Sequence, residues 1–130
     1  DTRIDELREI LRYAPDNATA RFDLAIIYYS QKKLGQALQE FETILAEHPA
    51  HPPTLHKLLS IYTAESQLEK AVDLALTILQ TNAQDTEVLF HLALLYLNLE
   101  RVDEALQTLT VLVGLDPDHP EAGALLQSFG

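Results

Sequence analysis

Apolar residues recur along this chain with the spacing of an α-helix. In residues 87–98 they lie three or four positions apart, which places them on one face of a helix: Leu89, Leu92, Ala93 and Tyr96. In residues 102–115 the same spacing returns: Val102, Ala105, Leu106, Leu109, Leu112 and Val113. Only a short polar link separates the two segments. The pattern therefore predicts two antiparallel helices joined by a tight turn.

The helix pair recurs at one fixed interval, which is the sequence separation of Pro15 and Pro49. We call this interval the repeat period. It relates four positions, three of them proline: Pro15, Pro49, Ala83 and Pro117. Other residues recur in the same phase: Leu24, Leu58 and Leu92; Tyr28, Tyr62 and Tyr96; Ala37, Ala71 and Ala105. A fixed period with matching residue types indicates one supersecondary unit stacked several times.

The period divides the chain into repeats within a single domain, residues 1–130. We expect a half-repeat at 1–17, full repeats at 18–51, 52–85 and 86–119, and a capping helix at 120–130. Residues 2–14 carry the pattern of a second helix. Residues 120–129 begin a first-helix pattern, which would cover the apolar face left by the last repeat. The sequence thus predicts an all-α protein of about eight helices.

Residues between the helices carry start and stop signals. Asn17 and Asp85 are predicted N-caps, because their side chains accept hydrogen bonds from free backbone N–H groups. Three prolines are expected in the first turn of a first helix: Pro52, Pro53 and Pro120. The prolines that recur with the repeat period follow the predicted ends of second helices.

Composition and charge limit the classes of partner that the chain is expected to bind. The chain has no Cys and a formal net charge of −11, with nine Lys and Arg that form no basic stripe. Binding to nucleic acid or to an anionic membrane is therefore not expected. The segment from residue 82 to the end has eight Asp and Glu, and Arg101 is its only Lys or Arg. This negative charge favours neutral or basic partners.

Targeting signals are not visible in the sequence. No apolar run reaches the about 20 residues that span a bilayer, and no signal peptide is present. The chain begins at Asp1 without Met, as a processed fragment would. The cytoplasm is favoured, and a periplasmic or membrane-associated location stays open if targeting segments have been removed.

The repeats resemble the tetratricopeptide repeat family over nearly the whole chain. Repeat one matches the family pattern with Arg21, Leu24, Ala25, Tyr28, Ala37, Phe41, Ile44 and Pro49. Repeat three matches it with Leu89, Leu92, Ala93, Tyr96, Ala105, Leu109, Leu112 and Pro117. Three positions depart from it: Arg21 replaces a large aromatic residue, Leu59 a small residue, and Ala83 a proline. The resemblance implies a right-handed superhelical solenoid of antiparallel helix pairs.

The resemblance also implies a concave groove, lined by the first helices, that takes a partner peptide. The matching positions in repeat one are Phe22, Asp23, Ile26, Tyr29 and Ser30. Those in repeat two are His56, Lys57, Ser60 and Thr63. Those in repeat three are Glu87, Phe90, His91, Leu94, Leu97 and Asn98. Many are large and apolar, as in an interaction surface, although the solenoid's curvature or further parts of the protein would also explain them.

Other kinds of site lack support in the sequence. There is no Gly-rich phosphate loop and no nucleophile elbow, so no enzyme activity is expected. Three histidines lie close in sequence without the compact Cys/His spacing of a zinc site, so neither a metal nor a cofactor is expected: His48, His51 and His56. Co-chaperone repeats hold acidic peptide ends with a clamp of Lys, Asn and Arg. The matching positions do not carry those residues as a set: Phe22, Ile26, Lys57, Glu87 and His91.

The sequence thus favours a protein–protein interaction scaffold. Its partner would be a peptide or helix with apolar anchors and basic flanks, bound in the concave groove. The alternative is self-assembly, with the domain pairing with further copies of itself through its groove or end surfaces.

Overall fold

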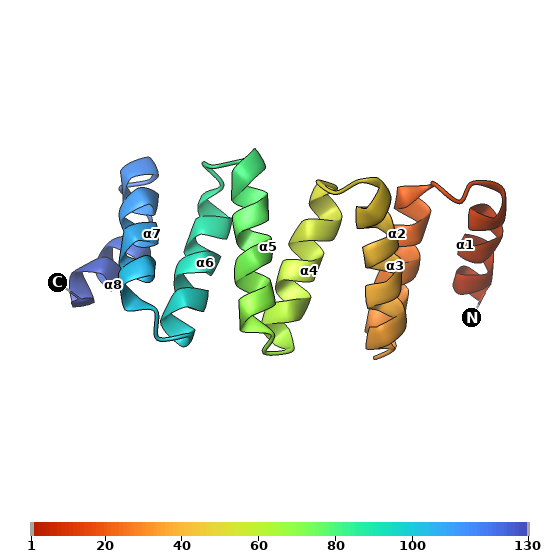
Figure 1. The fold of residues 1–130 in the computed structure, drawn as a ribbon, viewed down its shortest axis with the longest axis horizontal. Coiled ribbons are helices and arrows are strands. Elements are labelled where there is room, and N and C mark those ends of the chain that lie inside the picture. The colour runs from red at the N-terminus through yellow and green to blue at the C-terminus, as the bar shows by residue number, and fades with distance from the viewer. Residues whose placement is uncertain (1, 130) are drawn as a thin grey trace. The chain divides into compact units, whose positions relative to one another are not determined.

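A computed structural model describes residues 2–129, and these residues form eight α-helices in succession (Figure 1). The helices are α1 (Thr2–Tyr13), α2 (Ala18–Ser30), α3 (Leu34–Glu47), α4 (Pro52–Ala64), α5 (Leu68–Thr81), α6 (Thr86–Asn98), α7 (Val102–Leu115) and α8 (Ala122–Phe129). The predicted all-α class and helix number are confirmed. None of these described helices is long and apolar enough to cross a membrane.

The chain forms two compact units, Asp1–Thr54 and Leu55–Gly130. In the first unit, α2 packs against both α1 and α3. In the second, α6 packs against α5 and α7, and α8 packs against α7. Each of these contacts joins two helices that are consecutive in the sequence, as expected for a repeat protein. The predicted division into repeats within a single domain stays a prediction.

Small residues lie at the centre of the helix pairs. At the small-residue positions of the repeats, five alanines have 0% exposure, on first and second helices alike: Ala25, Ala37, Ala71, Ala93 and Ala105. Side chains of this size let two helix backbones approach closely. In repeat two Leu59 takes the small-residue position of the first helix and is 3% exposed. The larger side chain is therefore accommodated inside the unit.

The three periodic tyrosines are not equally buried. Tyr28 and Tyr96 are 3% and 6% exposed, whereas Tyr62 is only half-buried, although the same repeat position would predict that it is buried between the helices of repeat two. A cation lies over the ring of Tyr96 and over that of Tyr62. The Arg101 guanidinium is 4.9 Å from the ring centre of Tyr96, and the Lys70 ammonium is 5.6 Å from the ring centre of Tyr62. A planar guanidinium stacks on a ring and covers more of it than a hydrated ammonium does, which agrees with the greater exposure of Tyr62.

The unequal burial predicts unequal costs of truncation. Tyr96→Ala should lower the free energy of unfolding by about 3–5 kcal/mol, the range for a large buried aromatic residue. Tyr62→Ala should cost only about 1–2 kcal/mol, because part of its ring already contacts water. Urea denaturation of both variants measures the difference. Equal losses would contradict the burial seen in the structure.

A left-handed residue forms the turn inside each helix pair. Lys32, Ser66 and Glu100 have φ angles of 63°, 59° and 60°, and each stands one repeat period from the next. The N–H of the following residue donates to the carbonyl of the periodic tyrosine in all three turns: Lys33 to Tyr28, Gln67 to Tyr62 and Arg101 to Tyr96, at 2.9, 2.7 and 2.8 Å. This is the Schellman ending of a helix, in which glycine is the usual left-handed residue. The chain has no glycine at these three positions.

Replacing one of these residues with glycine should stabilise the protein. A left-handed conformation costs a non-glycine residue roughly 1–2 kcal/mol, and glycine removes this cost. Part of the gain is offset because glycine makes the unfolded chain more flexible, so folding loses more entropy. Glu100→Gly should therefore raise the free energy of unfolding by about 0.5–1 kcal/mol. The matched control Gln107→Gly, at an exposed site within α7, should lower it by about 1 kcal/mol. Chemical denaturation gives both signs, and a loss of stability in Glu100→Gly would contradict the turn geometry.

The predicted caps are confirmed, with one difference at α8. Asn17 Oδ1 accepts from the Ala20 N–H at 3.0 Å, and Asp85 Oδ1 accepts from the Val88 N–H at 3.1 Å. Pro52 and Pro53 open α4 as predicted. Pro120, however, lies in the turn before α8, so its predicted place in a first helical turn is wrong. The reason is local: the Leu125 N–H donates to the Glu121 carbonyl at 2.9 Å, so a helical backbone bond begins one residue after the proline, and His119 Nδ1 accepts from the Ala122 N–H at 3.0 Å.

Candidate functional site

In each full repeat, one of the first-helix positions predicted to line the groove contacts the cap residue of the next first helix. The cap positions follow the repeat period: Asn17, His51, Asp85 and His119. The ring centres of Phe22 and His51 are 6.3 Å apart, and those of Phe90 and His119 are 4.8 Å apart. In the equivalent pair, His56 Nε2 lies 3.8 Å from Asp85 Oδ2. Sequence reasoning missed this coupling, although the residue types at the two positions vary together.

In the first unit, the predicted groove residues are partly engaged in packing. Phe22 meets Phe41 edge-on, with ring centres 5.6 Å apart, so it contributes to the margin of the core. Asp23 pairs with Arg3 at 3.6 Å, which offsets the acidic charge expected there. Ile26 and Tyr29 are half-buried on the same helix.

In the second unit, α4 supplies the polar residues predicted for the middle of the groove. His56 and Ser60 are exposed and Lys57 is half-buried. The Ser60 hydroxyl donates to the His56 carbonyl at 3.4 Å. Because His56 also faces Asp85, the weakly basic character expected from these residues is reduced.

His91 on α6 is tied to α4 by a side-chain hydrogen bond. Its Nε2 lies 2.9 Å from the Thr63 hydroxyl, which donates its own proton to the Leu59 carbonyl at 2.8 Å. The hydroxyl must therefore accept from the imidazole, which places the proton of the neutral ring on Nε2. Burial lowers the pKa of His91 below its ordinary value of 6.5.

The lowered pKa of His91 predicts a loss of stability in mild acid. The unfolded chain takes up a proton at this residue first as the pH falls through about 6.5, so folding free energy is lost between that pH and the lower pKa of the folded state. His91→Gln should remove this part of the pH dependence, whereas the control His48→Gln, at an exposed site, should keep it. Thermal unfolding between about pH 5 and 8 measures it. Identical profiles for the two variants would contradict the assignment.

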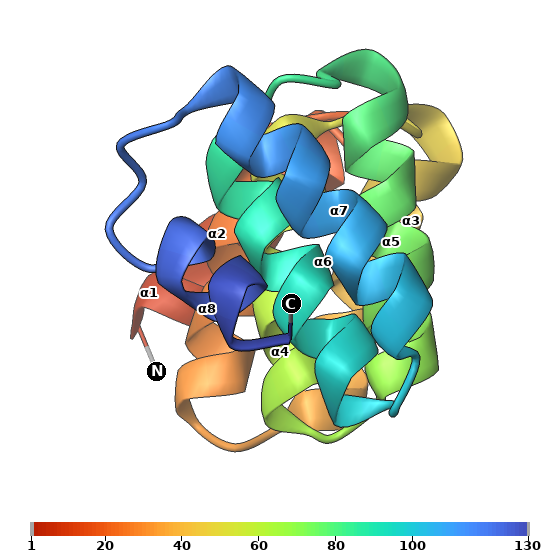
Figure 2. The same ribbon diagram turned by 90° about the vertical axis from the view of Figure 1, so that its left-hand side faces the viewer.

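An open apolar hollow of about 510 Å³ lies between α6 and α8. Two predicted groove residues, Phe90 and Leu94, form its α6 side. The α8 side and the turn before it supply the remainder: Pro120, Glu121, Ala124, Leu125 and Ser128. Figure 2 shows α6, α7 and α8 from the C-terminal end of the second unit. Sequence reasoning assigned residues 120–129 to capping alone and missed that they also build this hollow.

The hollow rests on a packed core. Leu89 and Ala93 of α6 cluster with Leu109 and Leu112 of α7 and with Ala122 of α8. Phe90, Leu125 and Leu126 pack against that cluster, so Phe90 has a structural as well as a surface role. Leu94, in contrast, is 39% exposed. Glu87 is exposed in the first turn of α6, and Leu97 is half-buried and not part of the lining.

Arg101, in the second unit, is paired with carboxylates. Its guanidinium donates to both carboxylate oxygens of Glu104, at 2.7 and 2.6 Å, and to Glu69 at 3.4 Å. Burial and the Glu104 charge together raise the pKa of Tyr96 beneath it.

Across residues 2–129, no group of three or more His, Cys, Asp or Glu is placed to hold a metal ion.

The repeat signal is confirmed by comparison with known families. A tetratricopeptide repeat model matches residues 4–61 and 62–128. The chain belongs to the tetratricopeptide repeat family. Domains of this family are protein-interaction modules and typically non-enzymatic scaffolds. No curated protein sequence matches the chain.

Solved structures share the fold. A tetratricopeptide repeat protein from Parabacteroides merdae is 26% identical, with a TM-score of 0.82 over 92% of this chain and 48% of that one. MamA from Desulfovibrio magneticus is 17% identical, with a TM-score of 0.78 over 95% and 70%. YrrB, described as having an unusual peptide-binding site, is 22% identical, with a TM-score of 0.75 over 92% and 61%.

Proposed function

We propose that this domain binds a partner peptide or amphipathic helix on its first-helix faces, with the hollow between α6 and α8 as the principal anchor site. The observation that carries the proposal is the exposed Leu94 beside the half-buried Phe90 in an apolar hollow built by two helices. Large apolar side chains seated in such hollows supply most of the binding energy in helix recognition. The predicted positions on α2 and on α4 are, each within its own unit, further candidate contacts for the partner.

The partner should carry basic residues beside its apolar anchors. Glu121 lines the hollow and Glu87 is exposed at the start of α6. The chain's net charge of −11 adds a long-range field of the same sign. Charges at the rim chiefly raise the association rate and select against acidic partners.

Family membership supports a binding role, and a peptide-binding site is named for YrrB, which has the same fold. A concave groove across all three repeats is part of this proposal. So is the apolar and basic chemistry of its ligand.

The test replaces one anchor and compares it with a matched surface change. Leu94→Glu places a charge in the hollow and should weaken partner capture at least about 30-fold, as loss of a central anchor does. Val111→Glu, at a site 51% exposed on α7, makes the same change outside the hollow. Capture from native extract, followed by quantitative mass spectrometry, compares the two variants, and circular dichroism checks their folding.

Recovery of the same partners with both variants would show that the hollow is not the binding surface. Light scattering of the isolated domain addresses the alternative of self-assembly. A mass that grows with concentration in the unmodified chain, and not in Leu94→Glu, would favour self-association through the hollow over a different partner.

A further inference from the structure

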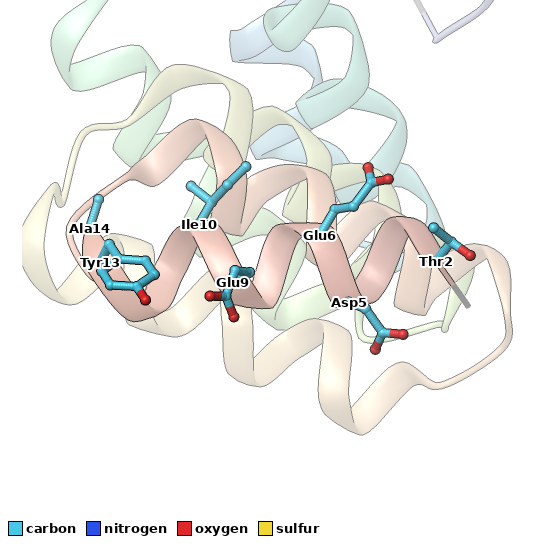
Figure 3. Close-up of a pocket in the computed structure, with 7 residues that line it drawn as sticks. All are labelled: Thr2, Asp5, Glu6, Glu9, Ile10, Tyr13 and Ala14. Atoms are coloured by element: carbon cyan, nitrogen blue, oxygen red, sulfur yellow. The ribbon is translucent and has the colours of Figure 1, made fainter.

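The outer face of α1, at the other end of the chain, is open and apolar. Ile10 is 41% and Tyr13 78% exposed. They line a hollow of about 740 Å³ together with Ala14, Thr2 and three carboxylates (Figure 3). The hollow lies entirely in the first unit and is separate from the one between α6 and α8.

The repeat period shows what normally covers this face. Ile10 stands one repeat period before Ile44, and the later equivalents are Ile78 and Leu112. These three are 2%, 3% and 0% exposed. Leu112 is buried in a cluster that includes Leu89 and Ala93 from the first helix of its own repeat. α1 has the pattern of a second helix but packs chiefly against α2, the helix that follows it. The helix type that would cover this face of α1 is therefore a first helix.

A second equivalence identifies the charge of that neighbour. Glu6 stands one repeat period before Glu40. Glu40 accepts a hydrogen bond from Arg21 at 2.7 Å, and both side chains are 19% exposed. Arg21 comes from the first helix of the same repeat. Glu6, in contrast, is 58% exposed and has only a 3.6 Å contact with Arg3.

The other charges of the hollow have the same sign. Asp5 and Glu9 also line it, and no Lys or Arg is among its described lining residues, although Arg12 beside the hollow pairs with Glu9 at 3.2 Å. We propose that the outer face of α1 docks an amphipathic helix of the first-helix type, which buries apolar residues on Ile10 and Tyr13 and presents an arginine to Glu6. This site is independent of the proposed function.

A second copy of the chain does not fit this description. Its exposed first-type helix, α8, contains no Lys or Arg and has Gly123 at the position of Arg21. It also has the polar Gln127 at the position of Ala25, where the other first helices bury an apolar side chain, Ala25, Leu59 or Ala93. The occupant is therefore a helix of a partner protein, not a second copy of this chain, and it carries the arginine.

The chain itself supplies a probe with the required pattern. A synthetic, fluorescein-labelled peptide of residues 17–31 contains the Asn17 cap, Arg21 and the apolar face of α2. Fluorescence anisotropy with the full chain should show saturable binding that a scrambled peptide lacks. Ile10→Glu should weaken this binding at least about 30-fold, because it places a charge at the centre of the contact. Leu76→Glu, at a site on α5 with the same 41% exposure, should leave it unchanged.

A charge exchange tests the role of Glu6. Arg21→Glu in the peptide should weaken binding about five-fold, as expected for a partly exposed ion pair. Glu6→Arg in the chain should restore the affinity for that altered peptide and weaken the affinity for the original one. Circular dichroism of each variant verifies that α1 remains folded.

Three results would overturn the proposal. The first is no binding of the peptide at about millimolar concentration, the weakest affinity of a specific contact. The second is binding that Ile10→Glu leaves unchanged. The third is self-association of the peptide-free chain, measured by sedimentation, that Ile10→Glu abolishes, because the occupant would then be a second copy. Leu94→Glu should not alter binding of the peptide, so failure here is distinguishable from failure of the proposed function.

Discussion

The fold depends on the close approach of helices at a few small side chains. Alanines with no exposed surface occur at the same phase on the second helix of all three repeats and on the first helix of repeats one and three, as Ala25 and Ala37 do in repeat one. Close packing at these points fixes the separation of the two helices. A short turn must then return the chain, and the left-handed residue of each Schellman turn does so at an energetic cost. Packing and turn geometry are thus consequences of one constraint repeated along the chain.

The same repetition builds the proposed binding surface. A residue on the outer part of each first helix contacts the cap of the next first helix, as Phe90 contacts His119. His119 in turn holds the start of α8 through its ring nitrogen. The α8 side of the hollow is therefore positioned by the helix that forms its other side. Phe90 carries both packing and surface roles, whereas exposed Leu94 is free of the first.

Periodicity made the helices and the buried alanines predictable, because burial every three or four residues leaves a direct trace in the sequence. Residues without such a trace were missed. Lys32, Ser66 and Glu100 adopt left-handed geometry with no glycine to announce it. The partial exposure of Tyr62 depends on which cation covers its ring, a tertiary contact that its own repeat position does not reveal. The hollow at Phe90 requires α8 to lie against α6, which spacing within either helix cannot show.

The departure at Arg21 has consequences beyond its own repeat. An aromatic residue at this position would bury its ring, whereas Arg21 forms a partly buried ion pair with Glu40 and donates to the Pro15 carbonyl at 3.0 Å. A charge in such a place is tolerated only when its hydrogen bonds are satisfied. Glu6 keeps the acidic half of this pair on α1, which packs against α2. At the other end, Gly123 occupies the position of Arg21, and α8 has lost the basic half. The two end helices are therefore chemically unlike: α8 closes the core of the last repeat, and α1 retains the acidic and apolar groups that a further first helix would satisfy.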